Sequence, residues 1–291
     1  MADVQNRTDS RRLKIDQVGV RKIRYPVDVK DRENGSQSTV ASVNMYVELP
    51  HNHKGTHMSR FIEILSRHHN SVSSSDIPSI LTDMKSRLQA EAAHLELSFP
   101  FFIARRAKAD GALAKMEYDC VLSGTHAAGA EPDLTISVAV PVTTLCPSPG
   151  EPAGAGVHSQ RGIVTVTVRY RRFFWMEDLV SLVEGCASGG VFSLLSSGDA
   201  SLSSGAAFAT KPCFVEDVVR VVAERLRADD NFFWFSVAAE FDESVHGRSA
   251  YAFLEFARED IDGSGLGYCG DGPGRARPET ASGAPPAGRG A

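Results

Sequence analysis

Apolar and polar residues alternate along most of this chain, which is the pattern of strands that bury one face. The segment 38–49 shows it best, since every second residue from Val43 to Leu49 is apolar. Further strands are expected at 19–30, 95–103, 116–122, 136–140, 164–170, 232–241 and 249–256. Pro26 lacks a backbone N–H, so the first strand is predicted to lie at a sheet edge or to carry a bulge.

Four segments instead repeat apolar residues at the helical spacing of three and four. The first helix is expected after Thr56 as N-cap, with Met58, Phe61, Ile62 and Leu65 on its buried face. The second is expected from about residue 76, with Pro78 in its first turn. Two more are predicted at 176–184 and at 214–226, the last with Phe214, Val218, Val221 and Val222 facing inward.

In chain order these elements read β-β-α-α-β-β twice, which suggests a duplicated module, although the halves share no obvious sequence repeat. Alternating strands with helices gathered on one face predict an α+β fold with antiparallel sheets. We expect one module at residues 15–130 and the second at 131–261. Residues 1–14 are polar and predicted to be flexible, and the Gly/Pro/Ala-rich tail 262–291 is predicted to be disordered.

The composition narrows the class of protein further. The 291 residues are 42% hydrophobic and 23% charged, which is typical of a globular protein. A net charge of −5 predicts no nucleic-acid partner, and the lack of a long apolar run predicts no membrane span. The 5 cysteines are odd in number and unevenly spaced, which argues against a disulfide framework and favours a cytoplasmic location.

Cys146 and His158 form the leading candidate site. The thiol is expected just past the end of one strand and the imidazole just before the next begins. Cys and His are ligands for zinc-like metals, and together they also make a nucleophile–base pair. A lone Cys is usually a small buried apolar residue, so the spacing alone leaves both interpretations of Cys146 open.

Other chemistry-bearing residues are less distinctive. Glu243 and His246 lie in the turn between the last two strands, where a carboxylate and an imidazole can move protons near neutral pH. Polar residues are also ordinary in an exposed turn. The histidines His51, His53 and His57 could bind a metal, or they could be an ordinary solvated loop. The arginines Arg60 and Arg161 could bind phosphate, or they could be ordinary surface residues.

Several blocks of the sequence, in order, match one family. They are Val18–Lys22, Leu49–Asn52, Lys54–Phe61, Pro141–Pro147, His158–Gly162, Phe214–Asp217, Glu243–His246 and Ala250–Ala252. With these blocks the chain resembles the prokaryotic type IB GTP cyclohydrolases over roughly Ile15 to Ala257. The resemblance implies two tandem tunnelling-fold modules, each β-β-α-α-β-β, in a cytoplasmic homotetramer with active sites at subunit interfaces.

The implied reaction converts GTP and water to 7,8-dihydroneopterin triphosphate and formate, the first step of folate biosynthesis. A divalent metal, zinc or another such as manganese, is implied to activate the attacking water, with no organic cofactor. By position in the family's motifs, Cys146 and His158 match metal ligands, and Cys146 is also implied to be catalytic. Glu243 and His246 match groups that relay protons. Arg161 is the candidate for binding substrate.

The sequence departs from the family's pattern at four positions. Ser148 stands where most members have a second cysteine, and Gly190 where most have a metal-binding glutamate. Gly205 falls near a glutamate thought to anchor guanine, and Arg248 falls at a second histidine. Three other acids, Glu177, Glu184 and Asp199, are candidates to replace the lost ligand.

These losses leave two rival hypotheses. One is a catalytically weak or inactive relative that keeps the tetrameric scaffold and binds a purine. The other is a tunnelling-fold enzyme of the nitrile reductase kind, with Cys146 as covalent nucleophile. A requirement for nicotinamide, without a requirement for metal, would distinguish the second rival from the hydrolase.

Overall fold

The structure is a computed structural model that describes part of the chain in detail. The described residues are 13–51, 55–68, 75–106, 113–146, 158–187, 189–190, 214–243 and 248–258. For residues 106, 145, 146, 158, 159, 189, 190 and 243, the structure describes the backbone alone. The predicted flexible start, apart from residues 13 and 14, and the predicted disordered tail 262–291 lie outside these ranges.

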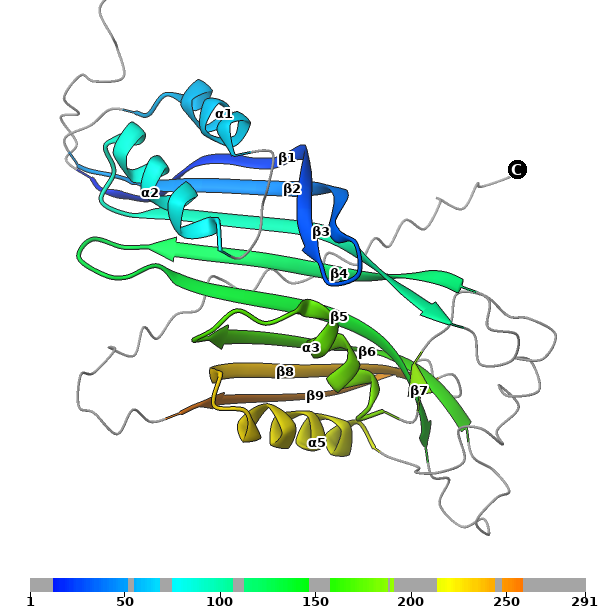
Figure 1. Ribbon diagram of the computed structural model, residues 1–291. Helices are drawn as coiled ribbons and strands as arrows, with labels where there is room; N and C mark the ends of the chain where they lie inside the picture. Colours follow the sequence, from blue (N-terminus) through cyan, green and yellow to red (C-terminus); the bar gives the residue numbers. More distant parts are fainter. Residues whose placement is uncertain are drawn as a thin grey trace, which may run out of the picture. The chain divides into compact units, whose positions relative to one another are not determined.

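One antiparallel sheet runs through the described chain (Figure 1). Its strands are β1 (Ile15–Asp31), β2 (Gly35–Leu49), β3 (Ala93–Arg106), β4 (Leu113–His126), β5 (Asp133–Cys146), β6 (His158–Tyr170), β7 (Gly189–Gly190), β8 (Phe232–Glu243) and β9 (Arg248–Ala257). The order across the sheet is β1-β2-β3-β4-β5-β6-β8-β9, and β7 pairs with β5 beside this path. The antiparallel prediction is confirmed, and so is the edge position that Pro26 indicated for its strand.

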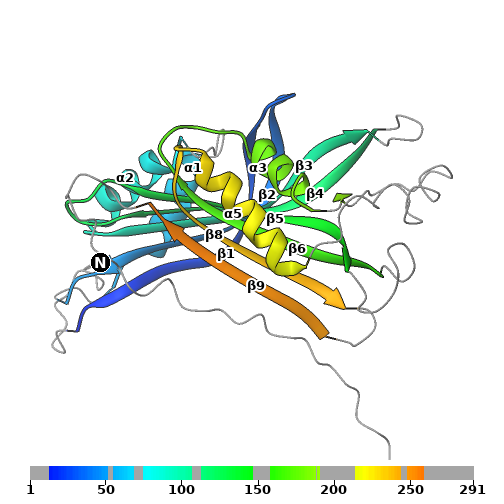
Figure 2. The ribbon, with the colours of Figure 1, turned by 90° about the horizontal axis from the view of Figure 1, so that it is seen from below.

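The helices of the described chain lie together on one side of this sheet, as Figure 2 shows. They are α1 (Met58–Arg67), α2 (Ile77–Leu88), α3 (Met176–Glu184) and α5 (Val215–Ala228). Both halves of the chain have two strands, then helices, then two strands, and in both the strands pair in the same order. The α+β class predicted from the alternation is therefore confirmed.

The core lies between the helices and the sheet. Alternate residues of each central strand are buried there, as the period of two requires. On β4 the buried residues include Tyr118 and Cys120, and on β8 they include Phe235 and Phe241. The intervening residues belong to the opposite, helix-free face. Away from the register shifts in the β1–β2 and β6–β8 ladders, a residue can therefore be assigned to a face by counting along the strand in steps of two, which is called its parity below.

Two predicted helical stripes were partly wrong. In α1 the buried residues are Phe61, Ile64 and Leu65, whereas Met58 and Ile62 are each 43% exposed. The N-cap of α1 is His57 rather than Thr56. The true stripe follows i, i+3 and i+4 from Phe61, which turns Ile62 away from the sheet.

The stripe of α5 is displaced in a similar way. Its buried residues are Val218, Val219, Val222, Ala223 and Leu226. Phe214 is the N-cap and 52% exposed, and Val221 is 37% exposed. Valines occur nearly all round this helix, so hydrophobicity alone did not identify the face that packs on β8 and β9.

The sheet splits between β4 and β5. These strands are paired from Thr125↔Asp133 to Asp119↔Ala139, and no further pair joins them. Beyond Ala139 the strand β5 continues away from β4, and β7 pairs with it instead at Val142 and Thr143. Figure 1 shows the ends of β3 and β4 diverging from β5, with β7 beside β5. Cys146 is the last residue of this diverging arm.

A search of the described residues finds no helix long and apolar enough to cross a membrane.

Helix α2 packs directly on Gly124 of β4, which gives a first test of the fold. A Cβ at this position would lie 2.5 Å from Ile77 Cγ2 and 2.9 Å from Leu81 Cδ1. Gly124→Ala should therefore lower the free energy of unfolding by about 1–3 kcal/mol in urea denaturation, because α2 must lift off the sheet. Ser123→Ala, at the next residue and on the opposite face, should change it by less than about 0.5 kcal/mol. Equal effects at the two positions would contradict the packing.

Candidate active site

Cys146 and His158 lie directly opposite each other in the β5–β6 ladder. They are the last residue of β5 and the first of β6, so both belong to strands rather than to the flanking loop. Directly opposed residues of an antiparallel pair have Cα atoms about 4.5–5.5 Å apart and share one face of the sheet. The two candidates are thus neighbours in space although a loop separates them in sequence.

The parity of the pair assigns it to the helix-covered side. Val142 and Thr144 precede Cys146 at even spacing, and both are buried, Thr144 at 1% exposure. The ladder continues without a shift through Thr144↔Gln160 to Cys146↔His158. The backbone positions of Cys146 and His158 are therefore adjacent at the end of the buried face, at the margin of the sheet.

Glu243 ends the next strand at the same margin. The β6–β8 ladder ends at Gly162↔Phe241, and Glu243 follows the buried Phe241 by two residues along β8. Because β5, β6 and β8 are neighbours in an antiparallel sheet, the last residue of β8 lies at the same end of the sheet as the last of β5 and the first of β6. His246, the other predicted proton-transfer group, lies outside the described residues.

Gly162 allows β6 and β8 to approach at this point. A Cβ on Gly162 would lie 2.2 Å from Phe241 Cδ1 and 2.4 Å from the carbonyl oxygen of Glu240. Real Cβ atoms do not come so close to other atoms, so only glycine fits. The ring of Phe241, 1% exposed, takes the space that a side chain on Gly162 would need. This contact aligns the Glu243 end of β8 with the His158 end of β6.

The donor types at this margin suit a divalent metal in part. A thiolate and an imidazole at opposed positions are two of the ligands that zinc prefers. Among the described side chains, which do not include those of Cys146, His158 and Glu243, no group of three or more His, Cys, Asp or Glu can hold a metal ion. The described chain thus supplies two strong ligand positions, with Glu243 nearby.

Two acids considered as replacement ligands are engaged elsewhere. Glu184 accepts hydrogen bonds from the Tyr118 hydroxyl at 2.6 Å and from Arg105 Nη2 at 2.8 Å. Glu177 accepts the backbone N–H of Arg32 at 2.9 Å, in the first turn of α3. Both carboxylates therefore serve the packing of α3, and neither supports the substitution hypothesis. Asp199 lies outside the described residues.

The structure locates two of the four departures from the family's pattern. Gly190 lies opposite Val142 in the β5–β7 ladder, on the same arm of β5 as Cys146. Arg248 lies opposite Glu243 in the β8–β9 ladder, so a cation position faces the predicted proton-transfer carboxylate. Ser148 and Gly205 lie outside the described residues.

The two candidate phosphate-binding arginines differ in their surroundings. Arg161 lies opposite Thr143, one residue out of phase with the Cys146–His158 pair, and it is exposed on the helix-free face. Within one chain the sheet therefore separates it from that pair. Arg60 is half-buried and donates from Nη1 to the carbonyl oxygen of Arg87 at 3.1 Å, which satisfies a carbonyl at the end of α2.

The predicted histidine cluster is described only in part. His51 is exposed in the turn after β2, and His57 is the N-cap of α1. His53, between them, lies outside the described residues, so a metal role for the three stays a prediction.

The other described thiols have different surroundings. Burial raises the pKa of Cys120, which belongs to the core. Burial also raises the pKa of Cys186, whose Sγ donates to the carbonyl oxygen of Leu182 at 3.0 Å. A thiol with a raised pKa is a poor nucleophile and a poor metal ligand at neutral pH. Cys120 and Cys186 are therefore structural, and Cys213 and Cys269 lie outside the described residues.

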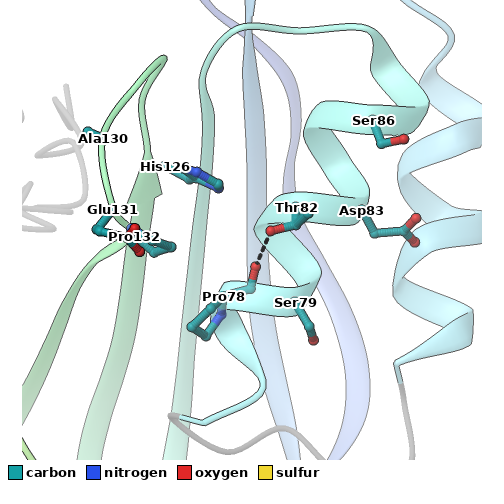
Figure 3. Close-up of a pocket in the computed structure, with 9 residues that line it drawn as sticks. All are labelled: Pro78, Ser79, Thr82, Asp83, Ser86, His126, Ala130, Glu131 and Pro132. Atoms are coloured by element: carbon teal, nitrogen blue, oxygen red, sulfur yellow. Dashed lines mark hydrogen bonds between the residues drawn. The ribbon is translucent and has the colours of Figure 1, made fainter.

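A groove between α2 and the β4–β5 turn is remote from this margin (Figure 3). It is lined by Pro78, Ser79, Thr82, Asp83, Ser86, His126, Ala130, Glu131 and Pro132. Its polar groups are partly used internally, since the Thr82 hydroxyl donates to the carbonyl oxygen of Pro78 at 2.8 Å. The groove lies at the Asp133 end of β5, roughly 40 Å along the strand from Cys146. It is not part of the Cys146–His158 site.

Solved structures with the same fold define the class first. A uricase from Bacillus fastidious matches with a TM-score of 0.51 at 7% identity, covering 84% of this chain and 93% of that chain. A highly active mutant of Bacillus sp. TB-90 urate oxidase matches with a TM-score of 0.52 at 7% identity, covering 84% and 100%. At such low identity the likeness concerns the fold alone. The chain is thus an α+β protein with the uricase type of antiparallel sheet.

Sequence comparison then identifies the family. The chain belongs to the type I GTP cyclohydrolase folE2 family, whose model matches residues 1–252. The GTP cyclohydrolase FolE2 of Syntrophobacter fumaroxidans is 49% identical over 255 residues, covering 88% of this chain and 99% of the relative. That of Magnetococcus marinus is 48% identical over 255 residues, covering 88% and 96%. The family resemblance noted from the sequence blocks is confirmed at this level.

Two features of the site were missed from the sequence. In the sequence Gly162 is distinctive only as part of a matching block, because a single sequence does not show that the ring of Phe241 fills the space of a side chain at this position. The anchoring of Glu184 by Tyr118 and Arg105 was also missed, since the three residues are distant in sequence.

Substituting Gly162 tests the alignment of β6 with β8. Gly162→Ala should lower the free energy of unfolding by about 1–3 kcal/mol and speed amide hydrogen exchange at the Glu243 end of β8. In a double-mutant cycle, Gly162→Ala should lower the free energy of unfolding by less in a Phe241→Leu background than in wild type, because the clash with the ring is relieved. Some loss should persist, since the clash with the Glu240 carbonyl remains. Thr165→Ala, on the helix-free face of β6, is the control. If Gly162→Ala matched that control, the close approach would be disproved.

Proposed function

We propose that this protein is a GTP cyclohydrolase that converts GTP and water to 7,8-dihydroneopterin triphosphate and formate. The observation that carries the proposal is the similarity to relatives named GTP cyclohydrolase FolE2, 44–49% identical over 88–89% of this chain. The register that groups Cys146, His158 and Glu243 at one end of three adjacent strands supports it.

In this proposal Cys146 and His158 hold a divalent cation between the ends of β5 and β6. Such a cation supplies Lewis acidity toward water and toward the purine. Cys146 binds as the thiolate and His158 as the neutral imidazole, so both ligands must lose a proton before they bind. Metal affinity should therefore fall as the pH is lowered.

Glu243 and His246 are proposed to move the protons. Attack of water at C8 of the purine requires a base to accept a proton, and opening of the ring requires an acid to protonate the departing nitrogen. Glu243 is the last residue of β8, and His246 follows it in the sequence before β9 begins. Arg161 is kept as a candidate for the triphosphate. Its exposed position on the other face suits contact with substrate held by a second subunit.

The finer description of the fold is also part of this proposal. The identical strand order of the two halves supports two tandem tunnelling-fold modules. In the described chain β1 and β9 each have one neighbour, so both sheet edges are available to other subunits. The family resemblance implies a homotetramer with active sites at subunit interfaces, and the two available edges are compatible with such an assembly. Sedimentation of the purified protein measures the assembly directly.

Turnover of GTP by protein stripped of metal and resupplied with zinc or manganese tests the proposed function. Formate release and the fluorescence of the oxidised pterin should appear together and only with metal. Neither product from folded, metal-saturated protein would support the inactive scaffold that binds a purine. Activity that needs a nicotinamide and no metal would support the Cys-nucleophile hypothesis.

Replacing the proposed ligands tests the site itself. Cys146→Ala and His158→Ala should each weaken zinc binding and lower turnover by at least about 10²-fold, because only two strong ligands are proposed. Cys120→Ala removes a buried thiol from β4 and should leave metal content unchanged. Full activity of Cys146→Ala would show that the assignment is wrong.

A further inference from the structure

The segment that follows α3 bridges the split in the sheet. Glu184 is the last residue of α3, and its carboxylate contacts Tyr118 of β4 and Arg105 of β3. A few residues later, Gly189 and Gly190 form β7 and pair with Thr143 and Val142 of β5. The described residues 184–187 and 189–190, here called the α3–β7 segment, therefore connect the two arms that diverge beyond Ala139.

The contacts at the Glu184 end are strong. Arg105 and Glu184 form an ion pair at 2.8 Å, with side chains only 26% and 21% exposed. Tyr118 is 1% exposed and donates to the other carboxylate oxygen at 2.6 Å. Burial, with the hydrogen bond to Glu184, raises the pKa of Tyr118 to about 12, so the phenol stays a donor at physiological pH. Charge-assisted bonds of this kind are stronger than neutral ones.

A third element holds the same turn. Arg225 of α5 donates from Nη2 to the carbonyl oxygen of Gly185 at 3.2 Å and from Nη1 to that of Leu182 at 3.5 Å. A Cβ on Gly185 would lie 3.1 Å from Arg225 Nη1, so the glycine leaves room for this contact. The exit of α3 is thus bound to β3, β4 and α5 before the chain reaches β5.

The other end of the segment is held weakly. The two residues of β7 pair with β5 at Val142 and Thr143, close to the Cys146 end of a strand that β4 no longer supports. A two-residue strand is unstable alone, so its position depends on where the preceding turn is fixed. The contacts of Glu184 and Arg225 fix that turn a few residues before β7 pairs with β5.

We propose that Arg105, Tyr118 and Glu184 are positioning residues for the Cys146–His158 site, acting through the α3–β7 segment on the Cys146 arm of β5. They touch neither substrate nor metal in this proposal. Their role is to keep β7 paired to β5 and so to fix the distance between the ends of β5 and β6. This inference rests on the proposed function, because the position of the Cys146 arm matters for activity only if Cys146 and His158 form the proposed site.

Amide hydrogen exchange of the holoprotein tests the structural half of this inference. Glu184→Gln and Arg105→Gln should speed exchange in peptides covering 140–146 and 185–190 by about ten- to a hundredfold, as expected for loss of a charged hydrogen bond. Tyr118→Phe removes one hydroxyl and should give a smaller increase in the same peptides. The matched control is Arg87→Gln, which breaks the Asp83–Arg87 ion pair of α2 at similar exposure.

Cobalt binding and kinetics test the functional half. Cobalt(II) bound to a thiolate absorbs in the near ultraviolet, so it reports Cys146 coordination without turnover. Glu184→Gln and Arg105→Gln should weaken cobalt binding about tenfold or more, with the same band at saturation, because the ligands are kept but less well placed. At saturating metal, kcat should fall more than KM rises. Arg87→Gln should match wild type in both measurements.

The outcomes separate the two proposals. Faster exchange with wild-type cobalt affinity and kcat would show a purely structural network and overturn the positioning role. Unchanged exchange in the 140–146 peptide would overturn it as well. If wild type itself bound no cobalt and released no formate, the proposed function would fail, and this inference with it.

Discussion

The β5–β6 ladder is the constraint on which the candidate site depends. Its register runs unbroken from Ile136↔Val168 to Cys146↔His158, so the position of the thiol relative to the imidazole is determined by the whole length of two strands. A slip of one residue would move Cys146 to the helix-free face and away from its partner. The buried valines Val138, Val140 and Val142 prevent that slip, since it would expose them all. Packing in the core therefore sets the geometry of a polar site at the margin.

The end of the sheet that carries the site is less supported than its middle. β4 leaves β5 after Ala139, and the last residues of β5 have β6 on one side and only the short β7 on the other. On the other flank, β8 approaches β6 closely because Gly162 has no side chain. Functional residues are often carried at strand ends and completed by the adjoining loops, which is consistent with a site at this margin. The contacts of α3 with β3, β4 and α5 supply support that the ladder itself lacks.

Much of the fold could be predicted from the sequence, because alternation reports burial directly. The strands predicted at 38–49 and 232–241 match β2 and β8 within a few residues, whereas the strand predicted at 164–170 begins six residues earlier, at His158. The antiparallel order follows from the hairpins. The faces of α1 and α5 were less predictable: both carry apolar residues outside the packed stripe, such as Ile62 and Val221. Tertiary packing decides which of the apolar residues on each helix face the sheet. Cys146 and His158 were recognisable as a pair, but their direct opposition in the ladder follows from the register, which a single sequence does not show.

X-ray absorption of the zinc-loaded protein tests the central claim most directly, since it counts sulfur ligands without requiring turnover. We predict one sulfur at about 2.3 Å, with the remaining ligands nitrogen or oxygen at about 2.0–2.1 Å, and loss of the sulfur shell in Cys146→Ser. A spectrum with no sulfur, or one that Cys146→Ser leaves unchanged, would contradict a metal held between the ends of β5 and β6.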